Sequence, residues 1–311
     1  MIPSLLSFGV SLLVGLILYP PFIRRLRRYG AGQVIQAELS EEHQAKAGTP
    51  TAGGVLFVVF AVIGGLLAVQ RGHQGALAAV VALGAGGLLG FADDRQKLRV
   101  GSRGIPARLK LPLQVLLALP VAWLAHAHSG GAQFPFPDLG WFYWPLAVIA
   151  IVGTANAINL TDGLDGLAGT VTVIVLAALV LILPRVLAGE KAVALVLIGG
   201  ILAFLWFNRH PARVFMGDTG SLALGYVVAA MALEQGMLFL LPLVGIIFVI
   251  ETLSVMIQVA YFRATGGRRV FKMTPIHYTF QLEGWSENRI AVTFGAVGLL
   301  AAAAAAALAR L

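Results

Sequence analysis

The sequence predicts an all-α integral membrane protein that crosses the bilayer about ten times. Its 311 residues are 59% hydrophobic and only 12% charged, and the mean hydropathy is +0.87. Apolar runs recur from end to end, and a bilayer core about 30 Å thick requires roughly 20 apolar residues for each crossing helix. This composition argues against a soluble protein. No shift in composition marks a second domain, so residues 1–311 are expected to form one helical bundle.

The predicted spans follow the apolar runs. They cover residues 5–23, 53–70, 76–92, 111–126, 142–158, 166–184, 192–208, 219–234, 238–262 and 289–308. The first run lacks the basic start and the cleavage site of a signal peptide, so it is predicted to remain as an uncleaved span. Glycines such as those of "GAGG" at 84–87 are expected to let helices pack closely. The stretch "AHSGGAQFPFPDLGW" at 127–141 suits a turn or hairpin at the membrane interface, because aromatic side chains favour that zone.

The basic residues orient the chain, because Lys and Arg near the ends of spans stay on the cytoplasmic side. With both termini outside, most of the 22 Lys and Arg residues fall in the inward loops; the exceptions are Arg71, Arg185, Lys191 and Arg310. The formal net charge of +8 is explained by basic rims that face anionic lipid headgroups, so it requires no nucleic acid, and it would also suit a phosphorylated substrate. The absence of cysteine excludes disulfides and cysteine-ligated metals.

Carboxylates gather at the inward ends of the predicted spans. Five of the six aspartates lie there, and Asp138 alone lies outside. The five are Asp93, Asp94, Asp162, Asp165 and Asp218. The predicted orientation depends on Lys and Arg alone, so the clustering of the aspartates is an independent observation. Because a carboxylate at membrane depth is costly, the five predict a shared site; the alternative is that each caps a helix or pairs with a nearby arginine.

The adjacent carboxylates of "GFADDRQKL" at 90–98 suit Mg²⁺, a hard cation that binds through one or two carboxylates together with substrate phosphates. Alternatively, crowding keeps Asp93 or Asp94 partly protonated for proton transfer. Lys97 is either a phosphate clamp or an ordinary positive-inside residue.

Two further strings place polar residues near span ends. In "NAINLTDGLDG", polar residues recur every third position from Asn156 to Asp165, a spacing that keeps them on one side of a helix, and the glycines favour a helix end or a close approach by a ligand. In "RVFMGDTGS" at 213–221, Asp218 is a candidate metal ligand at the start of a span, where backbone N–H groups attract anions. Thr219 is an N-cap candidate there, and Phe215 packs on the bilayer or stacks on a flat ring.

Two inward loops complete the candidate site. "HQAKAGTPTAGG" at 43–54 supplies His43 and Lys46 ahead of a glycine-rich turn that suits an anion. "KMTPIHYTFQLEGWSE" at 272–287 supplies His277, whose position favours a phosphate contact over a packed loop residue. Glu251 lies in the middle of a span, where it is either functional or holds two helices together. The remaining histidines lie outside these strings, with three of them predicted on the outer rim and the fourth without polar company. They are His73, His126 and His128 on the rim, and His210.

Taken together, the strings resemble the polyprenyl-phosphate N-acetylhexosamine-1-phosphate transferases, most closely the branch that transfers phospho-N-acetylmuramoyl-pentapeptide. The matching pieces, in order from residue 32 to 287, are "GQV", "HQAKAGTPTAGG", "DDRQK", "NAINLTDGLDGLA", "FMGDTGSLALG", "ETLSVMIQV" and "KMTPIHYTFQLEGWSE". The resemblance implies a ten-helix enzyme of the bacterial plasma membrane with a cytoplasmic, Mg²⁺-dependent site, and it also implies a homodimer. The implied reaction moves phospho-MurNAc-pentapeptide from its UDP carrier to undecaprenyl phosphate, giving lipid I and UMP, the first membrane step of peptidoglycan synthesis.

The resemblance also implies residue roles. Asp218 would ligate Mg²⁺, while Asp93 and Asp94 would act around the lipid phosphate, with Asp93 as its base. The nucleotide side would be formed by Asp162, Gly163, Leu164 and Asp165 at the uridine pocket, Phe215 stacked on uracil, and Lys46, Asn159 and His277 at the nucleotide or its phosphates.

The sequence departs from the family pattern at two places and leaves rival functions open. It has "HYT" where the family has three histidines, so only His277 carries over, and Ala52 stands where Met is usual. "TPI" and "LEGWSE" still favour the muramoyl branch over one that acts on UDP-GlcNAc. A proton-coupled transporter would place ionisable groups at the midplane, where only Glu251 lies. An intramembrane aromatic prenyltransferase would have no use for the "GTPTAGG" and "FMGDTGS" loops.

Overall fold

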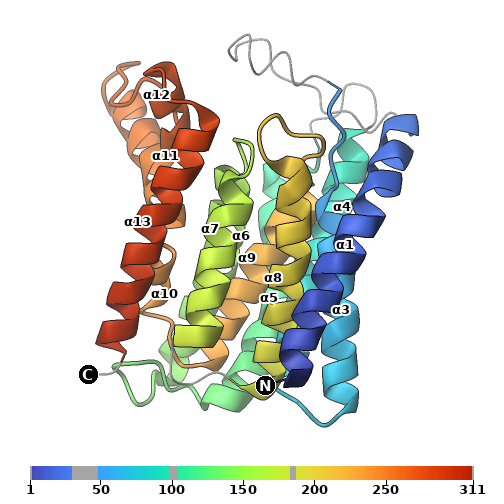
Figure 1. The fold of residues 1–311 in the computed structure, drawn as a ribbon. Helices are drawn as coiled ribbons and strands as arrows, with labels where there is room; N and C mark the ends of the chain where they lie inside the picture. The colour runs from blue at the N-terminus through green and yellow to red at the C-terminus, as the bar shows by residue number, and fades with distance from the viewer. Residues whose placement is uncertain (1, 30–47, 99–103, 183–186, 310–311) are drawn as a thin grey trace.

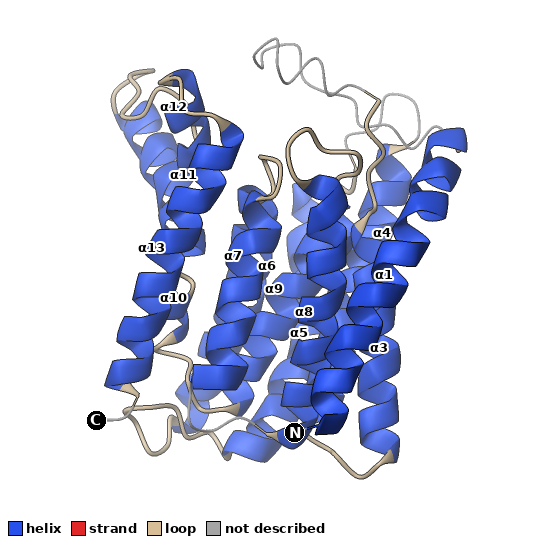
Figure 2. Cartoon of the chain, in the orientation of Figure 1, coloured by secondary structure: helices blue, strands red, loops and turns tan. Residues whose placement is uncertain are grey.

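The computed structural model describes residues 2–29, 48–98, 104–182 and 187–309. These residues are almost entirely helical, as Figure 2 shows, and the extended pairing among them is a single β-bridge between Gln133 and Phe136. The helices stand side by side along one common direction (Figure 1). The predicted all-α class is confirmed.

The long helices correspond to the predicted spans. They are α1 (Ile2–Arg28), α3 (Gly54–Gln70), α4 (Ala76–Lys97), α5 (Ala107–Ser129), α6 (Tyr143–Thr161), α7 (Leu167–Ala177), α8 (Ala188–Asn208), α9 (Gly217–Glu234), α11 (Ile246–Ala264) and α13 (Glu287–Leu308). Short helical turns are η1 (Gly140–Phe142), η2 (Ala178–Ile182), α10 (Leu241–Val244) and α12 (Ile276–Leu282). The predicted span 238–262 is divided at Gly245, and the predicted span 166–184 passes from α7 into the π-helical turn η2.

Seven helices in the described part of the chain are long and apolar enough to cross a membrane. They are α1, α4, α5, α6 with η1, α8, α11 and α13. The apolar helices Gly54–Gln70 and Leu167–Val180 are shorter, and α9 carries a carboxylate near each end. The chain is therefore a membrane protein, whereas ten crossings remain a prediction.

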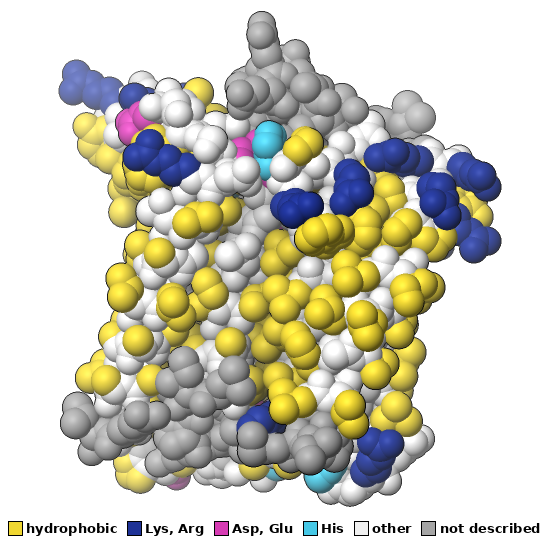
Figure 3. Space-filling model, in the orientation of Figure 1, with side chains coloured by type: hydrophobic (Ala, Val, Ile, Leu, Met, Phe, Trp, Pro, Cys, Tyr) yellow, Lys and Arg dark blue, Asp and Glu magenta, His cyan; other side chains and the backbone are white. Residues whose placement is uncertain are grey.

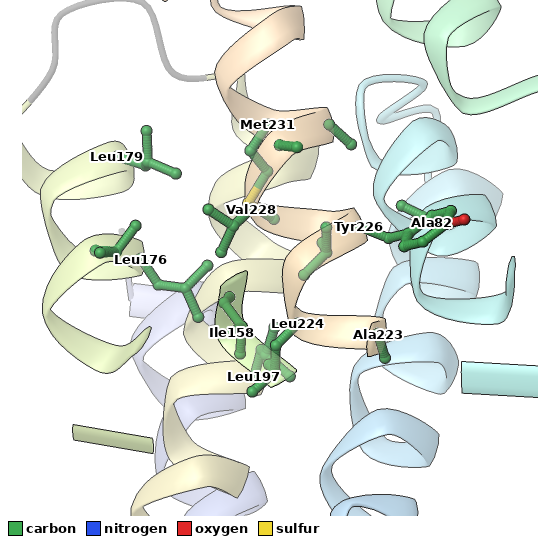
Figure 4. Packing of buried hydrophobic residues seen from close by; sticks show 14 of the residues in the cluster. Ala82, Ile158, Leu176, Leu179, Leu197, Ala223, Leu224, Tyr226, Val228 and Met231 are labelled. Carbon is green, nitrogen blue, oxygen red and sulfur yellow. The ribbon is translucent and has the colours of Figure 1, made fainter. Parts of the chain in front are cut away.

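Helix α9 lies at the centre of the bundle. Every residue from Asp218 to Glu234 is buried, and α9 packs against α4, α6, α5 and α3. Figure 4 shows Leu224 and Val228 of α9 in the core beside side chains of the neighbouring helices, including Ile158 and Leu197. A charged residue at the start of such a helix is therefore held against several neighbours at once.

Glycines let α4 approach the backbone of α9. A Cβ atom at Gly86 would lie 2.6 Å from the Leu222 carbonyl oxygen, and one at Gly90 would lie 2.1 Å from the Asp218 carbonyl oxygen. Both distances are too short for any side chain, so only glycine permits this approach. The predicted close packing is confirmed at Gly86 and extends to Gly90, whereas Gly84 faces open space. The contact places the end of α4 directly beside the start of α9.

One end of the bundle collects the polar segments singled out in the sequence. At this end, which we call the α12 end, α4 and α6 finish, α9 begins and α12 lies (Figure 1). Helix α1 begins and α13 finishes at the opposite end. On the face shown in Figure 3, most of the visible Lys and Arg side chains lie toward the α12 end, above a broad hydrophobic region. That the α12 end faces the cytoplasm remains a prediction.

Candidate active site

Asp218, in the first turn of α9, is held by two lysines and an asparagine. Lys97 Nζ, from the last turn of α4, donates to Asp218 Oδ1 at 2.7 Å, and Lys110 Nζ, from the first turn of α5, donates to Asp218 Oδ2. Asn159 Nδ2 of α6 donates to Asp218 Oδ1 at 3.1 Å. Asp218 is only 7% exposed, so its charge depends on these partners from three other helices.

Asp93 shares the same two lysines. Its Oδ2 lies 2.7 Å from Lys97 Nζ and 3.6 Å from Lys110 Nζ. Its Oδ1 accepts a hydrogen bond from the backbone N–H of Ile105 at 2.7 Å. Two carboxylates and two ammonium groups thus alternate in one cluster, which we call the Asp–Lys cluster (Asp93, Lys97, Lys110 and Asp218).

Asp94 has a different task from its neighbour in the sequence. Its Oδ1 accepts the backbone N–H of Asp218 at 2.9 Å, and its Oδ2 accepts the backbone N–H and the hydroxyl of Thr219 at 2.9 and 2.6 Å. These are donors in the first turn of α9, where a carboxylate is stabilised by unpaired N–H groups and by the helix dipole. For Asp94, therefore, the alternative that an aspartate caps a helix holds, although the helix it caps is α9 rather than its own. Thr219 lies inside the first turn and is not the N-cap, because α9 begins at Gly217.

The donors of the Asp–Lys cluster suit a magnesium ion. Asp93 Oδ2 and Asp218 Oδ1 each lie 2.7 Å from Lys97 Nζ, so these two oxygens are separated by no more than twice that distance. Mg²⁺ binds oxygen ligands at about 2.0–2.1 Å and usually takes one or two carboxylates. The two carboxylates converge on one position, where the positive charge of Lys97 stabilises them. A bound cation would stabilise them in the same way.

Asp162 ends α6 close to this cluster. Burial raises the pKa of its carboxyl group well above the usual value, and the negative charges of Asp218 and Asp94 raise it further. The charge of Lys97 acts in the opposite direction. Asp162 is thus within electrostatic reach of the Asp–Lys cluster.

His277 of α12 lies against the α6–α7 turn. Its Nδ1 is 3.1 Å from Glu251 Oε2 of α11, and both side chains are fully buried. On the other side, a Cβ atom at Gly163 would lie 2.4 Å from His277 Nε2 and 2.7 Å from Tyr278 Oη. Tyr278 Oη donates to the Gly163 carbonyl oxygen at 3.5 Å. Glu251 of α11 thus contacts His277 of α12, as the alternative that it holds two helices together predicts, and a functional role for Glu251 stays a prediction.

Gln258 of α11 holds the segment that leads into α12. It is not among the residues that the sequence motifs predict for the site. Its Oε1 accepts the backbone N–H groups of Val270 and Phe271 at 2.9 and 3.0 Å, and its Nε2 donates to the Phe271 carbonyl oxygen at 3.1 Å. Together with Glu251 and Ser254 it forms a buried polar stripe on α11, a helix whose other faces are largely exposed. The three- and four-residue spacing of that stripe is the sequence signal that could have found it.

Asp165 lies in a second polar group, together with His210 and Glu287. Its Oδ2 is 3.0 Å from His210 Nδ1 and accepts the backbone N–H of Ala212 at 3.0 Å, while its own N–H donates to Glu287 Oε2 at 2.8 Å. The expectation that His210 lacks polar company is wrong, because the segment after α8 folds back onto the α6–α7 turn. Ligand atoms of Asp165, His210 and Glu287 lie within 4.8 Å of one another, so this group could also hold a metal ion. The contacts that it makes tie α8, α13 and the turn together.

The remaining predicted residues fall near these groups or outside the described residues. Phe215 is half-buried, and its backbone joins the turn before α3: its N–H donates to the Pro50 carbonyl, and its carbonyl accepts from Gly53, both at 2.8 Å. Leu164 is 4% exposed, and its side chain packs in the core. Lys46 lies outside the described residues, as does His43.

Comparison with known proteins identifies the family. The model of glycosyl transferase family 4 matches residues 76–236, from α4 to just beyond α9, a range that includes Asp93, Asp162 and Asp218. The phospho-N-acetylmuramoyl-pentapeptide-transferase of Symbiobacterium thermophilum is 44% identical over 94% of this chain and 92% of its own length. Proteins of the same name from Pelotomaculum thermopropionicum and Oceanobacillus iheyensis are 46% and 41% identical over 96% and 95% of this chain, and over 95% and 94% of their own lengths. The chain therefore belongs to glycosyl transferase family 4, among the phospho-N-acetylmuramoyl-pentapeptide transferases, as its motifs predict.

Proposed function

We propose that the protein transfers phospho-MurNAc-pentapeptide from UDP-MurNAc-pentapeptide to undecaprenyl phosphate, giving lipid I and UMP. The observation that carries this proposal is the Asp–Lys cluster at one end of a membrane-spanning bundle. One substrate is a polyanion in water and the other is a hydrocarbon with a phosphate head, so the reaction requires charged groups at the membrane surface. The names of the relatives support phospho-N-acetylmuramoyl-pentapeptide as the transferred group.

The proposed reaction is a phosphoryl transfer. A phosphate oxygen of undecaprenyl phosphate attacks the phosphorus that bears the sugar and forms a new P–O bond. The bond from that phosphorus to the oxygen bridging the two phosphates breaks, and UMP leaves with this oxygen. A two-step alternative passes through an aspartyl phosphate, in which a carboxylate attacks first and undecaprenyl phosphate then displaces it.

The Asp–Lys cluster supplies the groups that this reaction needs. Asp218 is the proposed ligand of Mg²⁺, and Asp93, which lies on the same two lysines, is the proposed base toward the lipid phosphate. Lys97 and Lys110 would exchange carboxylate partners for phosphate oxygens as substrate binds. Asp94 is proposed to act indirectly, by fixing the first turn of α9 and therefore the position of Asp218. When bound, Mg²⁺ would spread the negative charge that grows on the diphosphate.

The nucleotide is proposed to bind between the Phe215 loop, the α6–α7 turn and α12. Phe215 would stack on uracil, and Asp162 and Gly163 would border the pocket. Asn159, His277 and Lys46 would contact the nucleotide or its phosphates. Leu164 and Asp165 would shape the pocket through the fold of the turn, because the side chain of the first is buried and that of the second is held by His210.

The same proposal covers the setting of the enzyme. We infer a multi-pass protein of the bacterial plasma membrane in contact with membrane lipid, with the α12 end in the cytoplasm and no role for nucleic acid. A homodimer is part of the proposal through the family resemblance.

The test is a transfer assay with purified protein, labelled UDP-MurNAc-pentapeptide and undecaprenyl phosphate, with and without Mg²⁺. We expect lipid-linked label and UMP in equal amounts, and loss of both products in the presence of a chelator. A parallel reaction with UDP-GlcNAc tests the other branch of the family, and transfer from UDP-GlcNAc alone would overturn the muramoyl assignment. UMP release without any ion gradient distinguishes the enzyme from a transporter.

A further inference from the structure

Asn208, the last residue of α8, bridges two segments that border the proposed nucleotide site. Its Oδ1 accepts the backbone N–H of Gly166 at 2.9 Å, and its Nδ2 donates to the Val214 carbonyl oxygen at 2.9 Å. Gly166 ends the α6–α7 turn, and Val214 precedes Phe215 in the Phe215 loop, residues 209–216. Asn208 is only 4% exposed. One buried amide group therefore joins the backbone of the turn to the backbone of the loop.

The Phe215 loop is also held from a second side. Phe215 makes two backbone hydrogen bonds with the turn before α3, and the Met216 carbonyl oxygen accepts the backbone N–H of Gly54 at 2.9 Å. Val214 and Met216 are fully buried, whereas Phe215 between them is half-buried. Phe215 is therefore the residue of these three that can meet a ligand. A shift of the Val214 carbonyl group would move its ring.

The α6–α7 turn has little freedom on its side of the amide. Gly166 has a φ of 76°, in the region that favours glycine, and its N–H points at Asn208. Asp165, the residue before it, accepts the backbone N–H of Ala212 in the Phe215 loop at 3.0 Å. The turn and the loop are thus joined at two neighbouring points. The amide of Asn208 lies between them and sets how far apart they are.

We propose that Asn208 is a positioning residue for the base of the nucleotide, because its amide group sets the distance and angle between the Phe215 ring and the α6–α7 turn. The inference rests on the proposed function, in which Phe215 stacks on uracil and the turn borders the pocket. Stacking depends on both the distance and the angle between two rings. Two hydrogen bonds from one planar amide fix both quantities for the segments that they join. The alternative is that the amide only stabilises the fold.

The first test measures binding of UMP to the purified protein by calorimetry. Asn208→Leu keeps nearly the same side-chain volume and removes both hydrogen bonds. Stacking strengthens the binding of a base by about 5- to 150-fold, and a displaced ring loses part of this gain, so UMP should bind about tenfold more weakly. The KM for the UDP-sugar should rise by the same factor, while the KM for undecaprenyl phosphate should not change.

A second variant covers the case in which Asn208→Leu does not fold. As a carboxylate, the side chain of Asn208→Asp keeps an acceptor for the N–H of Gly166 but has no N–H for the Val214 carbonyl oxygen. The variant should therefore also bind UMP more weakly than the wild type.

Gln133 supplies a matched control, because its side chain makes the same pair of hydrogen bonds at the opposite end of the bundle. Its Nε2 donates to the Leu233 carbonyl oxygen at 3.0 Å, and its Oε1 accepts the backbone N–H of Leu238 at 3.0 Å. Gln133 is also fully buried. Gln133→Leu should lower the melting temperature about as much as Asn208→Leu does, but it should bind UMP as the wild type does. Equally weak UMP binding by both variants would show that lost stability alone explains the effect, and it would overturn the positioning role.

A double variant tests whether Asn208 acts through Phe215. In protein that carries Phe215→Ala, adding Asn208→Leu should change the UMP affinity by less than about twofold, because the ring that Asn208 positions is gone. A further loss as large as that in the single variant would overturn the proposal. Wild-type UMP affinity in folded Asn208→Leu and Asn208→Asp would overturn this inference alone. A wild-type protein that does not bind UMP would overturn the proposed function as well.

Discussion

Replacing Gly163 by alanine tests whether α12 must lie against the α6–α7 turn. Gly163 is not among the described glycines with positive φ, so alanine meets no backbone strain there. The cost is purely steric, because the new Cβ would lie 2.4 Å from His277 Nε2 and 2.7 Å from Tyr278 Oη. The first atom belongs to a fully buried side chain of α12 and the second to a half-buried one.

The size of the effect follows from these distances. Ordinary contact with a Cβ atom begins near 3.4 Å, so His277 must move away by about 1 Å. Glu251 Oε2 lies 3.1 Å from His277 Nδ1 on the far side of the ring and opposes this movement. A displacement of about 1 Å at a group that positions substrate costs about 100-fold in rate, and overpacking a buried site costs about 1–3 kcal/mol of stability. We therefore expect Gly163→Ala to lower kcat about 100-fold in a protein that still folds.

The measurement is steady-state transfer of labelled sugar phosphate in detergent, together with thermal unfolding. Gly153→Ala is the matched control, because Gly153 lies in α6, the helix that leads into this turn, and its new Cβ would meet nothing within 4 Å. The control should retain wild-type kcat. Wild-type kcat in Gly163→Ala would refute the reasoning, because the catalytic site would then tolerate a shift of α12.

Three further predictions concern the other parts of the site. Asp218→Asn keeps the shape of the side chain but removes the negative charge that two lysines contact and that the proposed Mg²⁺ would bind, so kcat should fall about 1000-fold or more in the transfer assay. Phe215→Ala should raise the apparent KM for the UDP-sugar far more than the KM for undecaprenyl phosphate, because a stacking partner acts on uracil alone. Asp162→Asn should make the thermal stability less dependent on pH. Because burial raises the pKa of Asp162, its stabilising contribution is complete below the usual value of 3.8 and is lost as pH rises, so the melting temperature of the wild type should fall more steeply than that of the variant.

Each of these predictions has a contrary result. Near-native turnover of folded Asp218→Asn at saturating Mg²⁺ would remove Asp218 from the metal site. Equal changes in both KM values for Phe215→Ala would exclude a specific contact with uracil. A pH profile of unfolding that is the same for Asp162→Asn and the wild type would show that this carboxyl group does not titrate differently in the folded protein.

The sequence by itself determined the helical class, the positions of the helices and the family. Apolar runs and polar strings such as "DDRQK" and "FMGDTGS" are local features, and their order along the chain does not depend on how the helices pack. The sequence also predicted that the five aspartates lie at one end of the bundle. Successive spans cross the membrane in opposite directions, so every second loop lies on the same side. The sequence could not assign partners to these aspartates, because it does not show how one helix is aligned with the next.

Only the tertiary structure decided which side chains meet. The close approach of α4 to α9 at Gly86 and Gly90 gives the two adjacent aspartates different partners. Asp94 accepts hydrogen bonds from the backbone of α9, whereas Asp93 forms an ion pair with Lys97. The return of the segment after α8 gives His210 an unexpected partner in Asp165.

The polar stripe of α11 shows the same division between sequence and packing. Its spacing is visible in the sequence, but its partners come from the segment around α12. These contacts join residues far apart along the chain, and their geometry depends on the distance between helices, which small residues at the interfaces set and a linear pattern does not contain.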